Sequence, residues 1–451
     1  MHTFRGHCLT DATQTETVIN TYQGICQEVP PADHPMPLTV LLIPLGSAGD
    51  VHPLVGLADR LRRRGHHPVV VTNPHFEPLI RHLGLEFAPL STAEEYDRAT
   101  QHPDLWHPYR GFQIVARFAM LDTMRPIYEI IRQRHVAGRT VVVAPATALG
   151  ARIAHDKLGV PLVTVDLQPA LLRSRFNAPT LPPLLLGPRV PGWLKRFQYY
   201  LTDKLLVDPI LAGDVNAFRA ELGLPRVDRI LDAWWHSPHR VLGLFPAWFG
   251  PPQPDWPPTT TLASFPLWDE AEAREVPPEL ERFLGDGPPP IVFTPGSAMR
   301  QGREFFTAAI EATQRLGRRA LLLTRYREQL PPALPPGVGH FDYIPFSQVL
   351  PRAAAVVHHG GIGTVAQGLA AGVPQLIMPM SHDQPDNAAR IRRLGVGEAV
   401  WPKQFRGPAV AAALSELLNS PNTQVRCREL AARLANRDGL ELAADAIEQC
   451  V

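Results

Sequence analysis

The sequence contains few cysteines, and none of them has the spacing of a metal or redox site. Its 451 residues include only four, Cys8, Cys26, Cys427 and Cys450, with no CxxC pair. Sparse thiols without such spacing are typical of a reduced intracellular protein. We therefore expect a cytoplasmic protein that has no cysteine-bound metal.

Long apolar runs and an excess of one charge are also missing. No run approaches the roughly 20 residues that span a bilayer, and residues 1–36 lack the apolar core of a secretory signal. The 44 basic and 43 acidic residues give a formal net charge of +1, without a basic stripe. We expect no nucleic-acid partner, and we interpret residues 1–36 as a polar N-terminal extension.

Three ligand-binding motifs are absent. Neither GSAGDVHP (46–53) nor GGIGTV (360–365) completes GxGxxG, which weakens a nicotinamide or flavin interpretation. The phosphate loop GxxxxGK[ST] does not occur. D-x-D is also missing, which argues against a metal-chelating sugar-nucleotide site. We expect no bound cofactor and no metal.

Apolar runs of strand length alternate with helical patterns in both halves of the chain. LTVLLIPL (38–45) is followed by a small-residue loop, a helical stretch at 54–65 and a second strand. The same alternation of strand and helix patterns begins again at IVFTPGSA (291–298), after the proline-rich residues 245–290. Repeated strand–helix–strand units predict an α/β fold with parallel sheets.

The repeat predicts two Rossmann-like domains that face each other across a cleft. We place an N-terminal domain at 37–260, a proline-rich linker at 261–290, a C-terminal domain at 291–435 and a final helix at 436–451.

The stretch AVVHHGGIGTVAQGLAAG (355–372) places glycines where a strand ends and a helix begins. The first N–H groups of a helix lack partners and carry the positive end of its dipole, so they attract phosphate. Strand side chains alternate between faces, so only one of His358 and His359 can face a ligand. We predict that His359 does, together with Gly361, Gly363 and Thr364. The alternative is a turn that serves packing only.

Asp383 and Gln384 follow the apolar run PQLIMP (374–379), at the sheet edge where open α/β sheets bind ligands. A carboxylate and a carboxamide suit vicinal sugar hydroxyls. Asp383 also suits the N-cap of the following helix, and the two roles are compatible.

HHGGIGT (358–364), GLAAGVPQLIMP (368–379) and HDQPDNA (382–388) together resemble the donor-site signature of GT-B inverting glycosyltransferases, which include plant UDP-glycosyltransferases and antibiotic glycosyltransferases. The resemblance implies that the histidine–glycine turn binds the pyrophosphate of a nucleotide sugar, and that Asp383 and Gln384 bind its sugar. Gly296 and Ser297 match the second phosphate contact of that family. Tyr343, Phe346 and Ser347 lie where the base is bound, although the plant pattern differs there.

The acceptor side of that family corresponds to GSAGDVHP, which contains Ser47, Asp50 and His52. Plant members have a catalytic histidine where this chain has Asp50. We predict that Asp50 is the general base that deprotonates the acceptor hydroxyl. Asp50 as a helix cap and His52 as the base remain the alternatives.

A closer resemblance is to the rhamnosyltransferase B subunits of bacterial rhamnolipid synthesis. It rests on GSAGDVHP, PDLWHP (103–108), PAWFGPPQPDWP (246–257) and the donor signature. It implies a dTDP-L-rhamnose donor, a 3-(3-hydroxyalkanoyloxy)alkanoate acceptor and a mono-rhamnolipid product. An enzyme that supplies this hydroxy-fatty-acid dimer is an implied partner.

A fatty acceptor needs an apolar channel, for which residues 112–124 and 181–201 are candidates. The second stretch adds Arg189, Lys195 and Arg196, which suit a carboxylate headgroup or an anionic membrane surface, so peripheral contact with the inner membrane is also expected. The alternative is an amphipathic helix on its own core.

Three other functions remain open. One is a transferase of the same fold that uses another nucleotide sugar on a polyketide, a sterol or another lipophilic acceptor. The second is a non-catalytic protein that binds nucleotide sugars, and the third is a sugar-nucleotide epimerase.

Overall fold

The computed structural model describes residues 36–181, 190–297 and 299–450, and from Pro37 onward these form one compact unit. The expected polar extension, apart from Met36, lies outside the described residues. The same holds for Cys8, Cys26 and Arg189.

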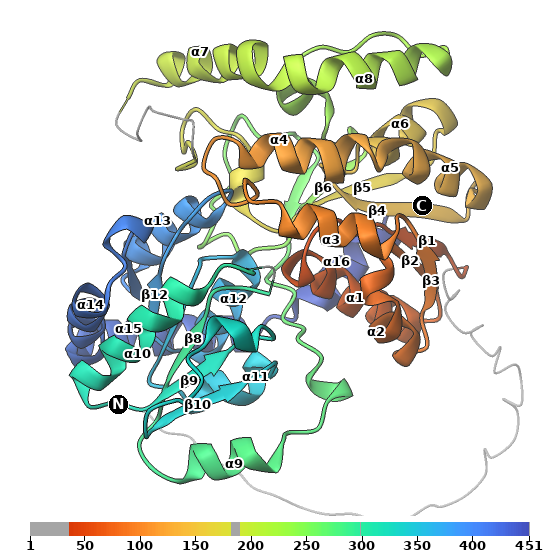
Figure 1. Cartoon of the computed structure of the whole chain (residues 1–451). Coiled ribbons are helices and arrows are strands. Elements are labelled where there is room, and N and C mark those ends of the chain that lie inside the picture. Colours follow the sequence, from red (N-terminus) through yellow and green to blue (C-terminus); the bar gives the residue numbers. More distant parts are fainter. Residues whose placement is uncertain (1–35, 182–189, 298, 451) are drawn as a thin grey trace, which may run out of the picture. The chain divides into compact units, whose positions relative to one another are not determined.

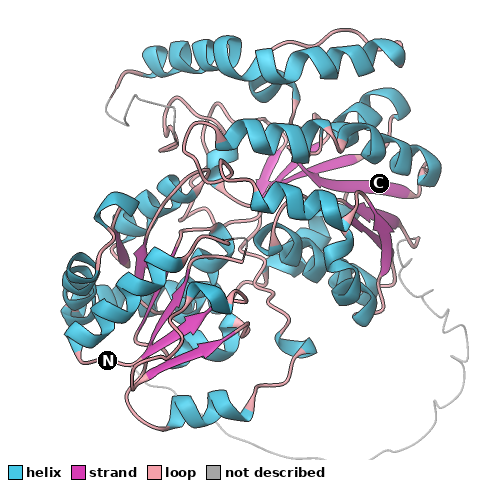
Figure 2. Ribbon diagram, viewed as in Figure 1, coloured by secondary structure: helices cyan, strands magenta, loops and turns pink. Residues whose placement is uncertain are grey.

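The N-terminal half contains a parallel seven-stranded sheet in the order β3-β2-β1-β4-β5-β6-β7 (Figures 1 and 2). Its strands are β1 (Thr39–Leu42), β2 (His67–Thr72), β3 (Glu86–Pro89), β4 (Thr140–Pro145), β5 (Leu162–Asp166), β6 (Arg240–Gly243) and β7 (Thr260–Leu262). Val40 and Leu42 face one buried core, and Leu41 and Ile43 face another. Cores on both faces explain why the strand sequences are continuously apolar.

Helices cover both faces of this sheet (Figure 2). The helices of this half are α1 (Ala48–Arg63), α2 (Glu77–His82), α3 (Ala93–Gln101), α4 (Gly111–Val115), α5 (Met124–Arg134), α6 (Leu149–Leu158), α7 (Gly192–Thr202) and α8 (Asp208–Glu221). Two π-helical turns, η2 (Ala116–Leu121) and η4 (Asp203–Val207), follow α4 and α7.

The C-terminal half contains a parallel six-stranded sheet in the order β10-β9-β8-β11-β12-β13. Its strands are β8 (Ile291–Thr294), β9 (Ala320–Leu323), β10 (Val338–Phe341), β11 (Ala355–His358), β12 (Gln375–Ile377) and β13 (Gly397–Ala399). The helices are α9 (Pro278–Gly285), α10 (Arg303–Leu316), α11 (Phe346–Val349), α12 (Ile362–Ala371), α13 (Gln384–Leu394), α14 (Gly407–Asn419), α15 (Pro421–Ala435) and α16 (Gly439–Glu448). Two parallel-sheet, Rossmann-like halves are the predicted fold class, which is confirmed.

The last helix returns to the N-terminal half, where α16 packs against α1 (Figure 1). Arg64 contacts Asp445 at 2.7 Å and Glu448 at 3.1 Å, and His66 Nε2 lies 2.9 Å from Glu448 Oε1. The chain therefore crosses between the halves twice, once after β7 and once before α16.

Two local predictions need correction. The stretch expected to be a loop at 46–53 is mostly helical, because α1 begins at Ala48 and the Asp50 carboxylate accepts the Ser47 N–H. The run FDYIP (341–345) also predicts a strand, but the strand of this region, β10, lies earlier and ends at Phe341. In the described ranges, no helix is both long and apolar enough to cross a bilayer.

The connection after β7 packs tightly on α1. Trp268 lies against Gly56, which is in the interior of that helix, and the Trp268 ring also meets the His52 ring edge to face at 5.6 Å between centroids. Only a residue without a side chain permits this approach.

We predict that Gly56→Ala destabilises the protein, although alanine favours a helix over glycine by about 1 kcal/mol. A Cβ at Gly56 would lie 2.6 Å from Cγ and 2.7 Å from Cβ of Trp268, so the connection would have to move. Gly213→Ala in α8 is the matched control, because nothing lies within 4 Å of a Cβ there. Thermal unfolding should show a lower midpoint for Gly56→Ala and an unchanged or higher one for Gly213→Ala. Equal midpoints would mean that Trp268 does not constrain α1.

Candidate active site

The predicted phosphate turn lies between β11 and α12. His358 is fully buried beneath it, with Nε2 3.0 Å from the Gln375 side-chain oxygen, and its Nδ1 accepts the Gly360 N–H at 3.0 Å. Burial lowers the pKa of His358 to about 3. Gly361 is the N-cap of α12 and has no side chain to satisfy the first N–H groups of the helix. These groups are therefore available to an anion in the adjoining cavity.

His359 lies on the other face of the strand end and lines that cavity. Its ring occupies the space above two glycines: a Cβ at Gly296 would lie 2.8 Å from the ring, and one at Gly361 would lie 2.6 Å from it. Nδ1 is buried and has no hydrogen-bond partner among the described residues. Burial lowers the pKa of His359 to about 4, so the ring is neutral and has one N–H to donate. An unpartnered buried nitrogen between two backbone turns suits a ligand oxygen.

The remaining predicted phosphate residues, Ser297, Gly363 and Thr364, also line the cavity, as does Gly296. Ser297 follows β8 and the other two lie in the first turn of α12, so neighbouring parallel strands bring both turns to one sheet edge. Their contact with phosphate stays a prediction.

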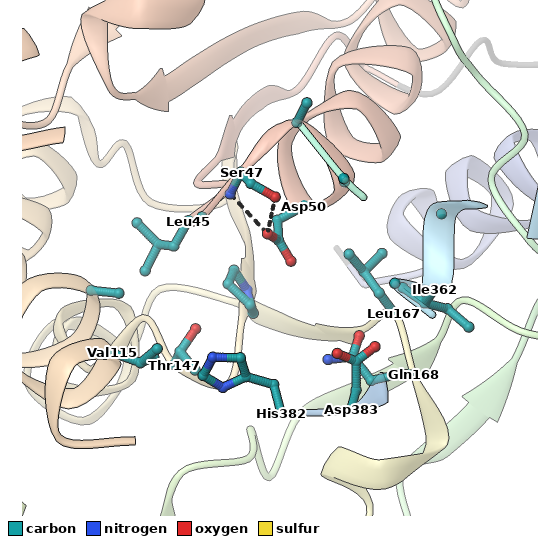
Figure 3. A pocket seen from close by; sticks show the side chains of 18 of the residues that line it. Leu45, Ser47, Asp50, Val115, Thr147, Leu167, Gln168, Ile362, His382 and Asp383 are labelled. Carbon is teal, nitrogen blue, oxygen red and sulfur yellow. Dashed lines mark hydrogen bonds between the residues drawn. The ribbon is translucent and has the colours of Figure 1, made fainter. Parts of the chain in front are cut away.

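Asp50 lies in the first turn of α1 and points into the same cavity (Figure 3). Its Oδ2 accepts the Ser47 N–H at 2.9 Å and lies 3.4 Å from Ser47 Oγ. Burial raises the pKa of Asp50 to about 6, although both Ser47 contacts favour the charged form. Both contacts use Oδ2, through which Asp50 caps the helix. Oδ1 has no partner among the described residues and is therefore free to accept a proton. A carboxyl with a pKa near neutrality is suited to take up a proton.

Asp383 is the N-cap residue of α13, and its side chain points into the cavity (Figure 3). Burial and the nearby negative charge of Asp50 raise its pKa to about 7. Asn387, which sequence reasoning missed as a site residue, donates its amide to Asp383 Oδ2 at 2.7 Å and to the Gly360 carbonyl at 2.9 Å. One side chain thus joins the phosphate turn to the predicted sugar-binding carboxylate.

Gln384 lines the cavity, but its side-chain oxygen is used by its own loop. Oε1 accepts the Met380 N–H at 2.8 Å and the Ser381 N–H at 3.3 Å. Its amide nitrogen is therefore the better placed group for a sugar hydroxyl.

The three residues predicted to bind the nucleobase divide into two groups. Tyr343 and Phe346 line the cavity, and the Tyr343 hydroxyl donates to the Asp269 carbonyl at 2.9 Å. Ser347 does not line the cavity, contrary to expectation. Its N–H and hydroxyl both bond the Asp269 carboxylate, at 2.7 Å and 3.1 Å. Ser347 therefore holds the connection between the sheets.

His52 is held by the same connection. Its Nε2 lies 3.0 Å from Glu270 Oε1, and its ring meets Phe76 and Trp268 edge to face. Glu270 is buried, has a left-handed backbone (φ 66°) and also accepts from Arg274 at 2.7 Å. His52 lines the cavity, yet its Nε2 is already paired with the Glu270 carboxylate. This favours Asp50 over His52 as the proton acceptor.

The loop that contains Leu105 and Trp106, in the N-terminal half, contacts the predicted donor-binding residues of the C-terminal half. The sequence did not predict this contact. His382 has a left-handed backbone (φ 57°), and its Nε2 donates to the Leu105 carbonyl at 2.9 Å. Trp106 meets the rings of His359 and His382 edge to face, at 6.4 Å and 5.8 Å between centroids. The loop thus covers the phosphate turn next to Asp383.

The cavity that these residues share has a volume of about 1200 Å³ and continues into an apolar chamber of the N-terminal half. Large apolar side chains of α4, η2, η4 and α8 line the chamber: Phe112, Ile114, Phe118, Met120, Leu205, Leu206 and Ile210. In the described ranges, no three His, Cys, Asp or Glu side chains are grouped so that they could hold a metal ion.

Comparisons with known proteins match both halves. Residues 40–176 match the glycosyltransferase family 28 N-terminal domain, and residues 321–448 match the erythromycin biosynthesis protein CIII-like C-terminal domain. O-mycaminosyltylonolide 6-deoxyallosyltransferase of Streptomyces fradiae is 32% identical over 91% of this chain and 97% of its own. Sterol 3-beta-glucosyltransferase of Leptosphaeria maculans is 26% identical over 92% of this chain but only 29% of its own.

Solved structures share the fold. The glycotransferase of kitacinnamycin superposes with a TM-score of 0.71 at 22% identity and covers 92% of this chain and 100% of its own. A spinosyn rhamnosyltransferase in complex with thymidine diphosphate gives a TM-score of 0.65 at 15% identity, over 91% of this chain and 100% of its own. Because the 32% identity to the Streptomyces fradiae transferase extends over nearly the whole of both proteins, this chain belongs to the GT-B family of antibiotic glycosyltransferases.

Proposed function

We propose that this glycosyltransferase transfers L-rhamnose from dTDP-L-rhamnose to the hydroxyl of a 3-(3-hydroxyalkanoyloxy)alkanoate and makes a mono-rhamnolipid. One observation carries the proposal. A single cavity connects Asp50 and the phosphate turn with an apolar chamber. A fatty acceptor that entered the chamber would be stabilised by about 0.8 kcal/mol for each methylene it buries.

The reaction is an inverting displacement without metal or cofactor. The acceptor hydroxyl attacks the anomeric carbon as the bond from that carbon to the diphosphate oxygen breaks, and Asp50 takes the hydroxyl proton. The leaving dTDP keeps the bonding electron pair. Its charge is stabilised by the first N–H groups of α12 and by the His359 N–H. Asp383 and the Gln384 amide orient the sugar hydroxyls.

The names of related proteins support a deoxysugar on dTDP. The Streptomyces fradiae relative is a 6-deoxyallosyltransferase, and one structural neighbour is a rhamnosyltransferase with bound thymidine diphosphate. The same comparisons favour one alternative, transfer to a polyketide or a sterol, because relatives act on a tylonolide and on a sterol.

A hydroxy-fatty-acid dimer must be supplied by an enzyme that joins two hydroxyacyl groups through an ester. Such an amphiphile partitions into membranes, so the proposal includes peripheral contact of this chain with the inner membrane.

Incubation of the purified chain with dTDP-L-rhamnose and a hydroxyalkanoyloxyalkanoate, in the presence of EDTA, should yield a rhamnosylated lipid by mass spectrometry. A macrolide aglycone and a sterol are tested in parallel with the same donor. Product only on one of these would replace the lipid acceptor with that compound. Product only after Mg²⁺ addition would refute the metal-free mechanism.

The Asp50 role predicts that kcat/KM rises with pH through about 6 to 7, because Asp50 and Asp383 have raised pKa values of about 6 and about 7 and the base must be ionised. Asp50→Asn should lower transfer at least about 100-fold while leaving dTDP affinity unchanged by calorimetry. Normal turnover by Asp50→Asn, or a wild-type rate independent of pH in this range, would exclude Asp50 as the base.

The His359 role predicts that His359→Ala weakens dTDP binding about tenfold, which is the loss of one hydrogen bond to a charged group. His359→Gln, which keeps an N–H donor, should recover part of the affinity. Binding of the diphosphate should also raise the low pKa of His359, so calorimetry in buffers of different ionisation enthalpy should detect more proton uptake by the wild type than by His359→Ala, in which Asp50 and Asp383 still titrate near neutrality. Equal affinity of the three proteins would contradict phosphate contact.

A further inference from the structure

Large apolar side chains cluster on the outside of α7 and η4. Thirteen such residues are exposed in the described ranges, and six of them fall within 193–206. They are Trp193 (71% exposed), Phe197 (51%), Tyr200 (40%), Leu201 (37%), Leu205 (64%) and Leu206 (49%), which together we name the docking face. The helix lies at the edge of the N-terminal half (Figure 1). Monomeric proteins rarely expose so contiguous an apolar surface without a partner for it.

The polarity of α7 is reversed relative to an ordinary surface helix. Lys195, Tyr199, Asp203 and Val207, spaced four residues apart, form the buried side. Asp203 is paired with Arg173 at 2.6 Å, and the Tyr199 hydroxyl donates to the Ser174 carbonyl at 3.1 Å. Polar contacts therefore fix the helix with its apolar side outward. The prediction that Lys195 meets a membrane surface is wrong, because that side chain is only 3% exposed.

The charges around the docking face suit an anionic surface. Arg196 and Lys204 are exposed beside the apolar residues. Asp203 is the only acidic residue within 192–207, and it is fully buried. Exposed aromatic and aliphatic side chains with cations and without an exposed acid are the features of a helix that lies in the interface of an anionic bilayer.

The docking face is also continuous with the catalytic cavity. Leu205 and Leu206 are 64% and 49% exposed, yet they line the apolar chamber together with Ile210. An apolar acceptor could therefore pass from a bilayer into the chamber without crossing water.

We propose that α7 and η4 bind an anionic lipid surface and that the acceptor enters the chamber from it past Leu205 and Leu206. Docking stands on the exposed face alone, whereas acceptor entry rests on the proposed lipid-acceptor function.

The test is co-sedimentation of the full chain with phosphatidylglycerol-containing vesicles and with neutral phosphatidylcholine vesicles. We expect binding to the anionic vesicles, reduced at high salt. Trp193→Ser/Phe197→Ser should weaken it at least about tenfold, and so should Arg196→Glu/Lys204→Glu. Trp401→Ser is the matched control, because Trp401 is 48% exposed but belongs to the C-terminal half, and it should bind as the wild type does.

Transfer to a short soluble acceptor should be unchanged in Trp193→Ser/Phe197→Ser, since neither residue lines the cavity, whereas transfer to an acceptor held in anionic vesicles should fall with vesicle binding. Unaltered vesicle binding by both double variants would overturn the proposal. A wild-type dimer that these variants convert to a monomer, without vesicle binding, would assign the face to a second copy of the chain and also overturn it. Vesicle binding without sugar transfer to any lipid acceptor would support docking and overturn acceptor entry together with the proposed function.

Discussion

The burial of two carboxylates in one cavity is the constraint on which the rest of the site depends. Removal from water favours the protonated form, so the pKa values of Asp50 and Asp383 rise to about 6 and about 7. Each carboxylate keeps a donor that opposes this effect, the Ser47 N–H for Asp50 and the Asn387 amide for Asp383. The cavity can therefore hold a proton acceptor whose pKa is near neutrality beside the first turn of α12, whose N–H groups attract the diphosphate of a nucleotide sugar.

Three consecutive residues between the sheets connect the two sides of this cavity. Trp268 packs on α1 at Gly56, Asp269 bonds Ser347 beside the base-side wall, and Glu270 bonds His52. The helix that carries Asp50 and the loop that carries Tyr343 are thus held by one short segment. The left-handed backbone of Glu270 shows that this segment keeps a conformation that costs free energy, which its side-chain contacts offset.

Much of the fold is readable from the sequence, because parallel strands covered on both faces require continuous apolar runs. The strand end at His358, the turn that follows it and the N-cap Asp383 are also local features of the chain. The start of α1 was missed because a glycine-rich stretch with a proline resembles a loop, whereas Asp50 closes the first turn through the Ser47 N–H. The contacts of His52, Ser347 and His382 could not be predicted, because each bonds a residue that is distant in the sequence.

The π-helical turn η4 determines how far α7 is rotated about its axis relative to α8. A π-helical turn adds one residue to an α-helix, and each helical residue turns the chain by about 100°. Deletion of one residue from η4 would rotate α7 by about that angle relative to α8 and would carry Trp193 and Phe197 off the outer side. A relative of this chain can therefore gain or lose an apolar outer surface through one codon, without any change in the composition of the helix. We therefore expect this surface to change among relatives through insertions and deletions at η4 more than through substitutions in α7.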